Sequence, residues 1–230
     1  MTAPRSNWVA EAISGDALRR FPQSILGQAI FAVGLSLMVN GGIGLPSWEI
    51  LHQGLSIKSG DAITIGQAAQ LSGLFVILLW IPIRQTPGLG TISNIVVIGF
   101  VMDLTLNAMR LLGVPAKEVL SQNLPVAVAL TVIGTALVGL GSGIYIGSGN
   151  GPGPRDGLMT GFHRLTGRPI WIVRTIIEIV VGIIGILLGG TFGFGTIWFA
   201  FTIGPQVQFW LARVDPSGRA KKQSATSSRR

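Results

Sequence analysis

Long apolar runs occupy most of the chain, and polar residues gather in the short stretches between them. Six runs approach the ~20 residues that a helix needs to cross a bilayer core of ~30 Å. They cover residues 24–39, 65–83, 91–112, 124–146, 169–188 and 196–211. No run alternates apolar with polar residues as lipid-facing strands do. The pattern therefore predicts an all-α membrane protein with six transmembrane helices.

Two of these runs end at breaks rich in glycine and proline. Residues 41–46 follow the first run and lead into a short segment at 47–55, while residues 147–157 follow the fourth and overlap a short segment at 156–165. Glycine and proline exclude a continuous helix through each break. Both segments are too short to cross the bilayer. We expect each to be a broken or re-entrant segment that follows the first helix of its half.

The two halves share a pattern of small residues. Four glycines recur at one constant offset, Pro46 and Pro154 correspond after a slip of one residue, and a Gly-Thr pair recurs further on. The matched glycines are Gly27, Gly34, Gly42 and Gly44 with Gly134, Gly141, Gly149 and Gly151, and the pairs are Gly90-Thr91 and Gly195-Thr196. Three crossings per half predict two inverted three-helix repeats, an arrangement of many secondary transporters. The alternative is that the glycines reflect only close helix packing in membranes.

Composition supports a membrane protein and narrows the chemistry. The chain has 230 residues, 48% of them apolar and 11% charged, whereas soluble domains carry about 25% charged residues. It contains no cysteine, which excludes disulfides and thiolate sites. Its two histidines are too few for a histidine-built metal centre. We expect no metal, no cofactor and no catalytic residues, and therefore not an enzyme.

The basic residues predict the orientation. Residues 213–230 hold six basic residues and one acidic residue, more than half of the net charge of +8. Arginines and lysines favour the cytoplasmic side and anionic lipid rather than nucleic acid here. We expect both termini in the cytoplasm and four parts: a cytoplasmic segment at 1–23 with an interfacial helix at 8–18, repeats at 24–113 and 124–212, and a disordered basic tail at 213–230.

Two charged residues lie inside the fifth run. Arg174 and Glu178 are one helical turn apart, and Glu178 lies about 14 Å from the start of the run, near the middle of the bilayer. A charge there costs about 2.5–3.5 kcal/mol and needs a partner or a wet cavity. The pair is either a substrate or proton site or an internal ion pair that fixes packing. Gln70 corresponds to Glu178 in the first half.

Further polar candidates lie in the third run and at the second break. Asp103 and Asn107 share a helix face with Arg110, so Asp103 and Arg110 can pair, and Gln208 corresponds to Asp103. Arg155 and Asp156 begin the second short segment: either Asp156 caps its N-terminus, or the glycine-rich backbone and Arg155 form an anion-binding nest. We expect His52 and His163 to be interfacial residues.

Several of these motifs resemble the YczE/YyaS/YitT family of bacterial integral membrane proteins. They are Gly-Pro-Arg-Asp-Gly-Leu-Met at 153–159, Arg174 with Glu178, and the glycine-rich run at 188–196. The resemblance extends over residues 27–211 and is closer to the YczE-like branch, since no soluble C-terminal domain follows the sixth run. It implies a multi-pass protein of the bacterial inner membrane, without an agreed substrate.

Two functional hypotheses remain. The first is a secondary transporter or permease that moves a small solute by alternating access. Its site would include Arg155, Asp156, Arg174, Glu178, Asp103, Asn107, Gln70 and Gln208. The second is a non-transporting membrane scaffold that holds a cytoplasmic enzyme or complex through the second short segment and the basic tail. Expected partners are the lipid bilayer, the solute, and a cytoplasmic protein or further copies of the chain.

Overall fold

The computed structural model describes residues 15–215 and 218, and regular structure within them is entirely helical. The helices are α2 (Gly15–Gly41), α3 (Ser47–Lys58), α4 (Ile65–Trp80), α5 (Leu89–Leu111), α6 (Lys117–Leu120), α7 (Leu124–Gly147), α8 (Pro154–Thr166), α9 (Ile170–Leu187) and α10 (Phe194–Val214). Every predicted apolar run contains a helix, although α4 ends at Trp80, three residues before the predicted end of its run, and both predicted short segments are helices as well. The prediction of an all-α protein is confirmed.

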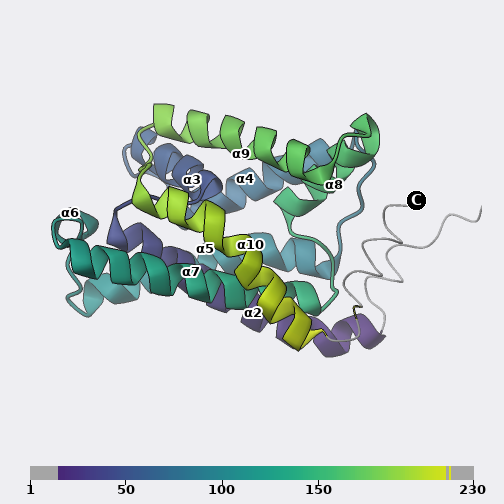
Figure 1. Cartoon of the computed structure of the whole chain (residues 1–230), viewed down its shortest axis with the longest axis horizontal. Helices are drawn as coiled ribbons and strands as arrows, with labels where there is room; N and C mark the ends of the chain where they lie inside the picture. The colour runs from purple at the N-terminus through teal and green to yellow at the C-terminus, as the bar shows by residue number, and fades with distance from the viewer. Residues whose placement is uncertain (1–14, 216–217, 219–230) are drawn as a thin grey trace, which may run out of the picture.

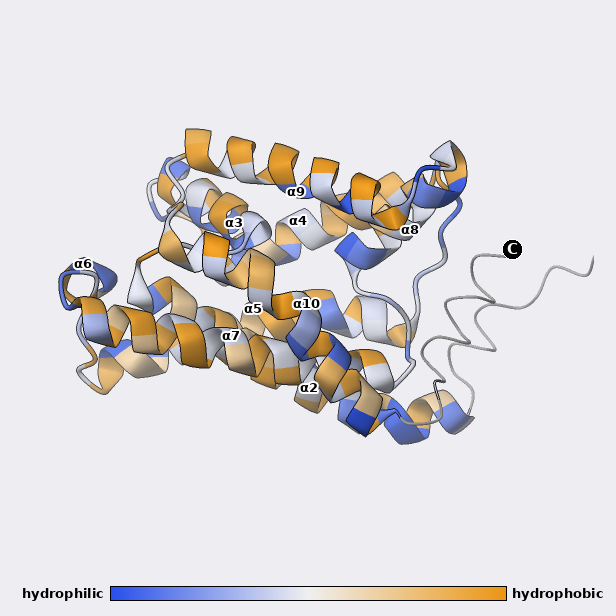
Figure 2. Cartoon of the chain, viewed as in Figure 1, coloured by the Kyte–Doolittle hydropathy of each residue, from blue (hydrophilic) through white to orange (hydrophobic). Residues whose placement is uncertain are grey.

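Four helices of the described chain, α2, α5, α7 and α9, are long and apolar enough to cross a membrane. Helix α4 is apolar but has only 16 residues. Many large apolar side chains of these helices are exposed, and Figure 2 shows apolar residues along most of α9. Such surfaces are unfavourable in water and favourable in lipid.

Two predicted boundaries need correction. Helix α2 begins at Gly15 and not at residue 24, because its polar first turns are helical too, with an ion pair of 3.4 Å between Asp16 and Arg20 one turn apart. Residues 15–23 therefore belong to the first long helix. Helix α10 continues to Val214, past the predicted start of the tail. The rest of that tail, and residues 1–14 with most of the expected interfacial helix, lie outside the described residues.

Helices α2 and α7 lie side by side (Figure 1) and pack against each other more extensively than any other pair of described helices. An added Cβ at Gly34 would lie 2.6 Å from the carbonyl oxygen of Gly134, and one at Gly27 would lie 2.8 Å from that of Gly141. The reciprocal contacts are equally short, at 2.6 Å and 2.5 Å. Only glycine allows this approach, so the matched glycines of the two halves meet each other in an antiparallel pair.

The two breaks also make corresponding contacts. The N–H of Gly90, at the start of α5, donates to the carbonyl of Asn150 at 2.7 Å, and the N–H of Gly195, at the start of α10, donates to that of Ile43 at 2.9 Å. Gly42 and Gly149 adopt φ values of 71° and 70°, a left-handed conformation that glycine adopts without strain. Each break therefore supports the last helix of the other half.

One pair of corresponding helix contacts differs. Helices α4 and α5 pack closely at Gly66 and Gly99, where an added Cβ at Gly66 would overlap the backbone of α5. Helices α9 and α10 barely touch, and Gly204, which corresponds to Gly99, has no neighbour within 4 Å of an added Cβ. Arg174 stands where the first half has Gly66. The second half therefore has a long charged side chain where the first half has a glycine at a close helix contact.

The bundle has two distinct ends (Figure 1). Helix α6 lies at one end, which we call the α6 end. Helix α8, the start of α2 and the end of α10 lie at the other, which we call the α8 end.

Candidate functional site

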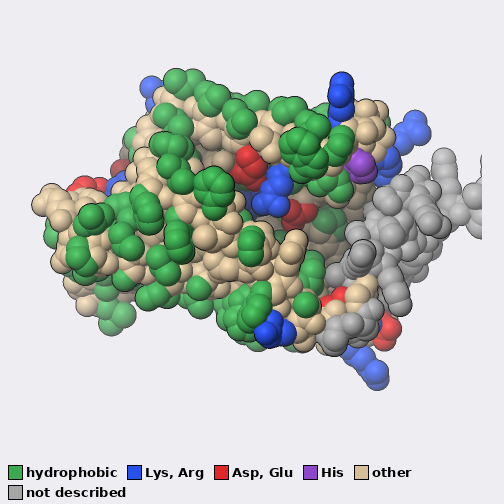
Figure 3. Space-filling view, viewed as in Figure 1, with side chains coloured by type: hydrophobic (Ala, Val, Ile, Leu, Met, Phe, Trp, Pro, Cys, Tyr) green, Lys and Arg blue, Asp and Glu red, His purple; other side chains and the backbone are tan. Residues whose placement is uncertain are grey.

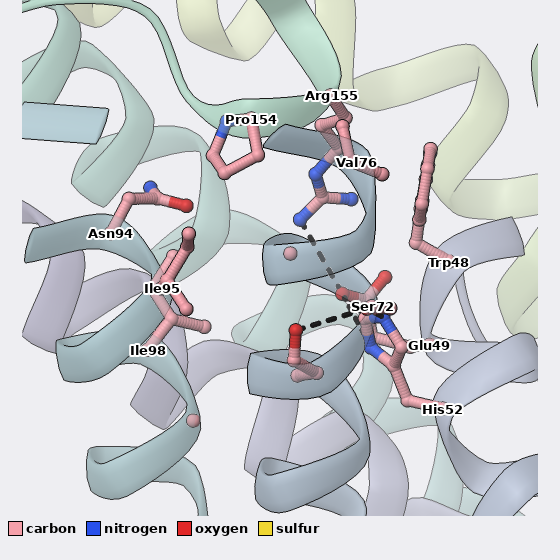
Figure 4. Close-up of a pocket in the computed structure, with 13 residues that line it drawn as sticks. Trp48, Glu49, His52, Ser72, Val76, Asn94, Ile95, Ile98, Pro154 and Arg155 are labelled. Atoms are coloured by element: carbon pink, nitrogen blue, oxygen red, sulfur yellow. Dashed lines mark hydrogen bonds and ion pairs between the residues drawn. The ribbon is translucent and has the colours of Figure 1, made fainter. Parts of the chain in front are cut away.

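A buried ion pair joins the two short helices. Glu49 lies in the first turn of α3 and is 1% exposed. Arg155 lies in the first turn of α8, and its Nη2 is 3.4 Å from Oε1 of Glu49 (Figure 4). Each short helix begins at its break, so the two breaks place these side chains at the same point. A buried carboxylate needs such a partner, because burial of an unpaired charge is very unfavourable.

Aromatic side chains hold the guanidinium of Arg155. Its Cζ lies 5.6 Å from the ring centre of Phe31 and 5.9 Å from that of Trp48, within range of cation–π attraction. The hydroxyl of Tyr145 donates to the neighbouring Asp156 at 3.3 Å. Contacts from α2, α3 and α7 therefore fix the start of α8.

His52 extends the polar cluster to α4. Its Nε2 lies 2.7 Å from Oγ of Ser72, and this hydroxyl donates to the carbonyl of Ala69 at 2.9 Å. When the hydroxyl of Ser72 donates to Ala69, Nε2 of His52 is the donor to Ser72, whereas the other tautomer of His52 would accept from it. Its Nδ1 lies 3.9 Å from Glu49, too far for a hydrogen bond. A catalytic Ser-His-acid triad also needs a hydrogen bond from the histidine to the acid, and this separation does not provide one.

A small cavity of about 40 Å³ adjoins this cluster and is lined by Glu49, His52, Ser72, Asn94 and Arg155 among others (Figure 4). Buried polar atoms around it have no hydrogen-bond partner in the protein, including Oε2 of Glu49 and Nδ1 of His52. A cavity that holds one water requires only about 10–15 Å³. The site therefore has room for a few water molecules or a very small ligand.

A second cavity of about 570 Å³ lies between α9 and α10 and reaches the start of α3. Arg174 and Glu178 line it, and Figure 3 shows acidic and basic side chains in the hollow on this face. Glu178 acts electrostatically on both Glu49 and Arg155. The larger cavity and the buried ion pair are therefore electrostatically linked.

The structure separates the eight predicted site residues. Arg155 and Asp156 lie at the buried cluster, and Arg174 and Glu178 line the larger cavity, although no ion pair joins these two among the described residues. Two others hold α4 against α5. Gln70 donates to the carbonyl of Val96 at 3.2 Å, and Asp103 accepts from the N–H of Gly66 at 2.9 Å and from Thr64.

The other two predicted residues, Asn107 and Gln208, are exposed and line neither of the two cavities described. The predicted pairing of Asp103 with Arg110 is absent from the described ion pairs, because Asp103 binds the first turn of α4 instead. Its role there is to tie α4 to α5 rather than to contact a solute in this conformation.

The expectations for Asp156 and His52 also need correction. Gly153 is the N-cap of α8 and Asp156 is two residues past Pro154, so Asp156 favours the helix by its charge and not as a cap. Arg155 points to Glu49 and does not complete an anion-binding nest. His52 is 5% exposed, which is a core position and not an interfacial one. Within residues 15–215 no group of His, Asp and Glu is arranged to hold a metal ion.

Sequence reasoning did not assign Glu49, His52 or Ser72 to the site. A signal was present, because Glu49 and His52 lie one turn apart in a segment that begins at a break between apolar runs. Ser72 gave none, since a single hydroxyl inside an apolar helix usually bonds to its own backbone.

The chain matches known proteins over most of its length. Residues 18–212 match the profile of "Family of unknown function (DUF6198)". A Haemophilus influenzae protein described as "Uncharacterized protein" is 34% identical over 90% of both chains. From Bacillus subtilis, "Uncharacterized membrane protein YczE" is 30% identical over 80% of this chain and 82% of its own, and "Uncharacterized protein YyaS" is 27% identical over 75% and 82%.

No solved structure matches the chain. The named relatives confirm the expected resemblance, and a membrane protein agrees with the apolar helices described above. This chain therefore belongs to the family described as "Family of unknown function (DUF6198)", and it is similar to relatives named YczE and YyaS.

Proposed function

We propose that this protein is a secondary transporter that moves a small solute across the bacterial inner membrane by alternating access. The observation that carries this proposal is the Glu49–Arg155 pair, which lies where the two short helices begin and adjoins a charged cavity. Transporter sites commonly lie where interrupted helices from two repeats meet. Charges inside a membrane protein are costly and mark such pathways.

The paired contacts favour two inverted repeats of three crossings each. In a two-fold arrangement, a contact between one position and a second position is accompanied by the reverse contact. The glycine contacts between α2 and α7 follow this rule, and so do the hydrogen bonds from Gly90 to Asn150 and from Gly195 to Ile43. The matched breaks and short helices complete the argument for repeats that enter the membrane from opposite sides.

The difference between the halves corresponds to one state of a transport cycle. The α4–α5 pair is packed while the α9–α10 pair is open. Basic residues at the α8 end, including Arg84, Arg164 and Arg168, favour a cytoplasmic location for this end and for both termini. In this orientation the open pair faces inward. The opposite state would open α4 from α5, where Gln70 and Asp103 now make the closing contacts.

Cysteine accessibility tests this mechanism without knowledge of the solute. The natural chain has no cysteine, so Ala69→Cys and Ala200→Cys each introduce a single reactive thiol. Ala69 lines the small cavity and Ala200 the larger one. A membrane-impermeant maleimide is applied to intact cells and to inverted membrane vesicles. Alternating access predicts that Ala69→Cys reacts from both faces, while Ala200→Cys reacts faster from the cytoplasmic face.

The scaffold hypothesis predicts a different result. A protein with one static conformation exposes each thiol to one face at most. Reaction of Ala69→Cys from a single face, or from neither, in correctly folded protein would therefore exclude alternating access through this site. The cysteine-free natural protein gives the background of the assay.

A further inference from the structure

The cavity between α9 and α10 is polar at one end and apolar at the other. Arg174, Thr175 and Glu178 lie in the first half of α9, near α8. Toward the α6 end the wall becomes apolar, with Ile183, Ile186 and Phe192. A molecule that fills this cavity would have its charged part toward the α8 end and an apolar part toward the α6 end.

This cavity opens on the side of the bundle and widens toward the α8 end, because α9 and α10 diverge from the short link that joins them at the α6 end. Helices α9 and α10 run across the face seen in Figures 1 and 3, and the hollow lies between them. In a membrane, that face would contact the hydrocarbon region. Helix α9 is also the least enclosed of the four candidate spans, with 17% of its apolar window buried. Entry from the lipid therefore needs no movement of the central α2–α7 pair.

The residues of the second half favour the open arrangement. Gly66 and Gly99 let α4 pack closely on α5, whereas the long side chain of Arg174 stands opposite Gly204 at the corresponding positions. Glu178 likewise replaces Gln70, whose amide ties α4 to α5. Where the first half has the packed α4–α5 contact, the second half has two opposite charges that line the cavity between α9 and α10.

We propose that this cavity binds a phospholipid of the surrounding bilayer whose headgroup carries both an ammonium and a phosphate. Glu178 pairs with the ammonium, Arg174 binds the phosphate, and one acyl chain lies along the apolar wall between α9 and α10. This inference replaces the small solute of the proposed function with a lipid that enters the cavity beside the Glu49–Arg155 pair, and it rests on the proposed function only in treating the lipid as a substrate. The binding itself is independent of transport.

The chemistry of the two side chains selects this headgroup. A guanidinium binds phosphate oxygens through two parallel hydrogen bonds, and a carboxylate accepts from an ammonium. No ion pair joins Arg174 and Glu178 among the described residues, so both remain available to a ligand. A headgroup with a single charge would leave one of them unpaired in a largely apolar cavity, which is unfavourable.

The size of the cavity distinguishes a lipid from a small metabolite. A volume of about 570 Å³ lies within the range of about 300–1,000 Å³ that holds drug-sized ligands. A free amino acid would satisfy both charges but leave the wall formed by Ile183, Ile186 and Phe192 without contacts. A second copy of the chain would have to insert an apolar segment beside two uncompensated charges.

Native mass spectrometry of the full-length protein in one fixed detergent tests this proposal. The probe is a lysophosphatidylethanolamine, which carries one acyl chain, a phosphate and an ammonium. A lysophosphatidic acid of the same chain length lacks the ammonium, and L-leucine has an ammonium and a carboxylate but neither the phosphate nor the long chain. We expect one bound lysophosphatidylethanolamine per protein, with at least tenfold weaker binding of the other two. Equal binding of lysophosphatidic acid, or tighter binding of L-leucine, would overturn the proposed ligand class.

Matched variants locate the bound lipid. Glu178→Gln should weaken lysophosphatidylethanolamine binding about tenfold while leaving lysophosphatidic acid unaffected, and Arg174→Gln should weaken both. Ile183→Trp fills the cavity, whereas Ile184→Trp adds the same volume to a neighbour that is exposed but does not line it. Lipid binding that survives Ile183→Trp as well as it survives Ile184→Trp would place the lipid elsewhere and reject this site.

This result and the accessibility test can fail separately. If Ala69→Cys reacts from both faces but no lipid binds the cavity, transport stands and the substrate class is wrong. If the lipid binds as expected and Ala69→Cys reacts from one face only, the cavity is a lipid site of a protein that does not transport. A stable dimer that loses lipid binding would identify the cavity as an interface between copies and would also reject the proposal.

Discussion

Nη2 of Arg155 lies 3.4 Å from Oε1 of Glu49, so one ion pair connects residues that are 106 positions apart in the chain. Each residue lies in the first turn of a short helix that begins at a glycine- and proline-containing break. At this pair the two halves of the protein contact each other through opposite charges. We expect this ion pair, with the aromatic side chains around Arg155, to hold the two short helices together.

Removal of Arg155 should destabilise the fold strongly. Arg155→Met leaves the carboxylate of Glu49, which is 1% exposed, without its cation. The loss of one partner of a buried pair costs about 3–5 kcal/mol. We expect a clearly lower unfolding midpoint for Arg155→Met than for the natural protein in the same detergent, measured by tryptophan fluorescence or by retention of a monodisperse elution peak.

The double variant separates charge from packing. Glu49→Gln combined with Arg155→Met removes both charges, so it should be more stable than Arg155→Met alone. A double variant that loses as much stability as the two single variants together would show that the two residues do not interact energetically, contrary to this expectation.

The contact between α2 and α7 should not tolerate a methyl group. Gly34→Ala places a Cβ 2.6 Å from the backbone oxygen of Gly134, so the two central helices must move apart. Overpacking of this kind costs about 1–3 kcal/mol. Gly204→Ala is the matched control, because an added Cβ there has no neighbour within 4 Å. Thermal unfolding in detergent should show a lower midpoint for Gly34→Ala and little change for Gly204→Ala.

The helices could be predicted from the sequence because hydropathy and helix-breaking residues act locally. Residues 124–146 were expected in a span and α7 covers Leu124–Gly147, since a long apolar segment bounded by polar residues has few alternatives. The predicted start of the first long helix was wrong because a helix can continue beyond the apolar run from which it was predicted. Pro22 lies within this helix, and no apolar pattern marks the preceding turns.

The site could be predicted only in part, because its contacts join distant elements. Arg174 and Glu178 were identified by their charge in an apolar run, and both line the larger cavity. The partner of Arg155 could not be found by spacing, since Glu49 belongs to the other half of the chain. For Asp103, a charge in an apolar run does not distinguish a solute contact from a helix contact, and its hydrogen bonds in this conformation tie α4 to α5.

Labelling from each side of the membrane should establish the orientation of the two ends. Gln122 lies near the α6 end and Thr166 at the α8 end, and both are exposed. The distribution of basic residues predicts that the α8 end is cytoplasmic. An impermeant maleimide should therefore label Gln122→Cys in intact cells and Thr166→Cys only after cell lysis. The reverse pattern would invert the proposed orientation and place the larger cavity toward the outside.

Restoring the residues of the first half should close the larger cavity. Arg174→Gly with Glu178→Gln gives α9 the residues that occupy corresponding positions in α4, where Gly66 packs against α5. If Arg174 is what holds α9 away from α10, Gly204 can then act as Gly99 does. The probe is Ala200→Cys, which lines the cavity, and its maleimide labelling rate should fall about tenfold in the restored background. An unchanged rate would mean that the separation of α9 from α10 has another cause, such as a conformational state of the whole bundle.

Arg110→Gly, at an exposed position on α5, is the control for a general effect of removing a charge. Because the two substitutions change no residue of the α2–α7 contact, a lower labelling rate in a protein with an unchanged unfolding midpoint would assign the asymmetry of the two halves to position 174 and its neighbour one turn away.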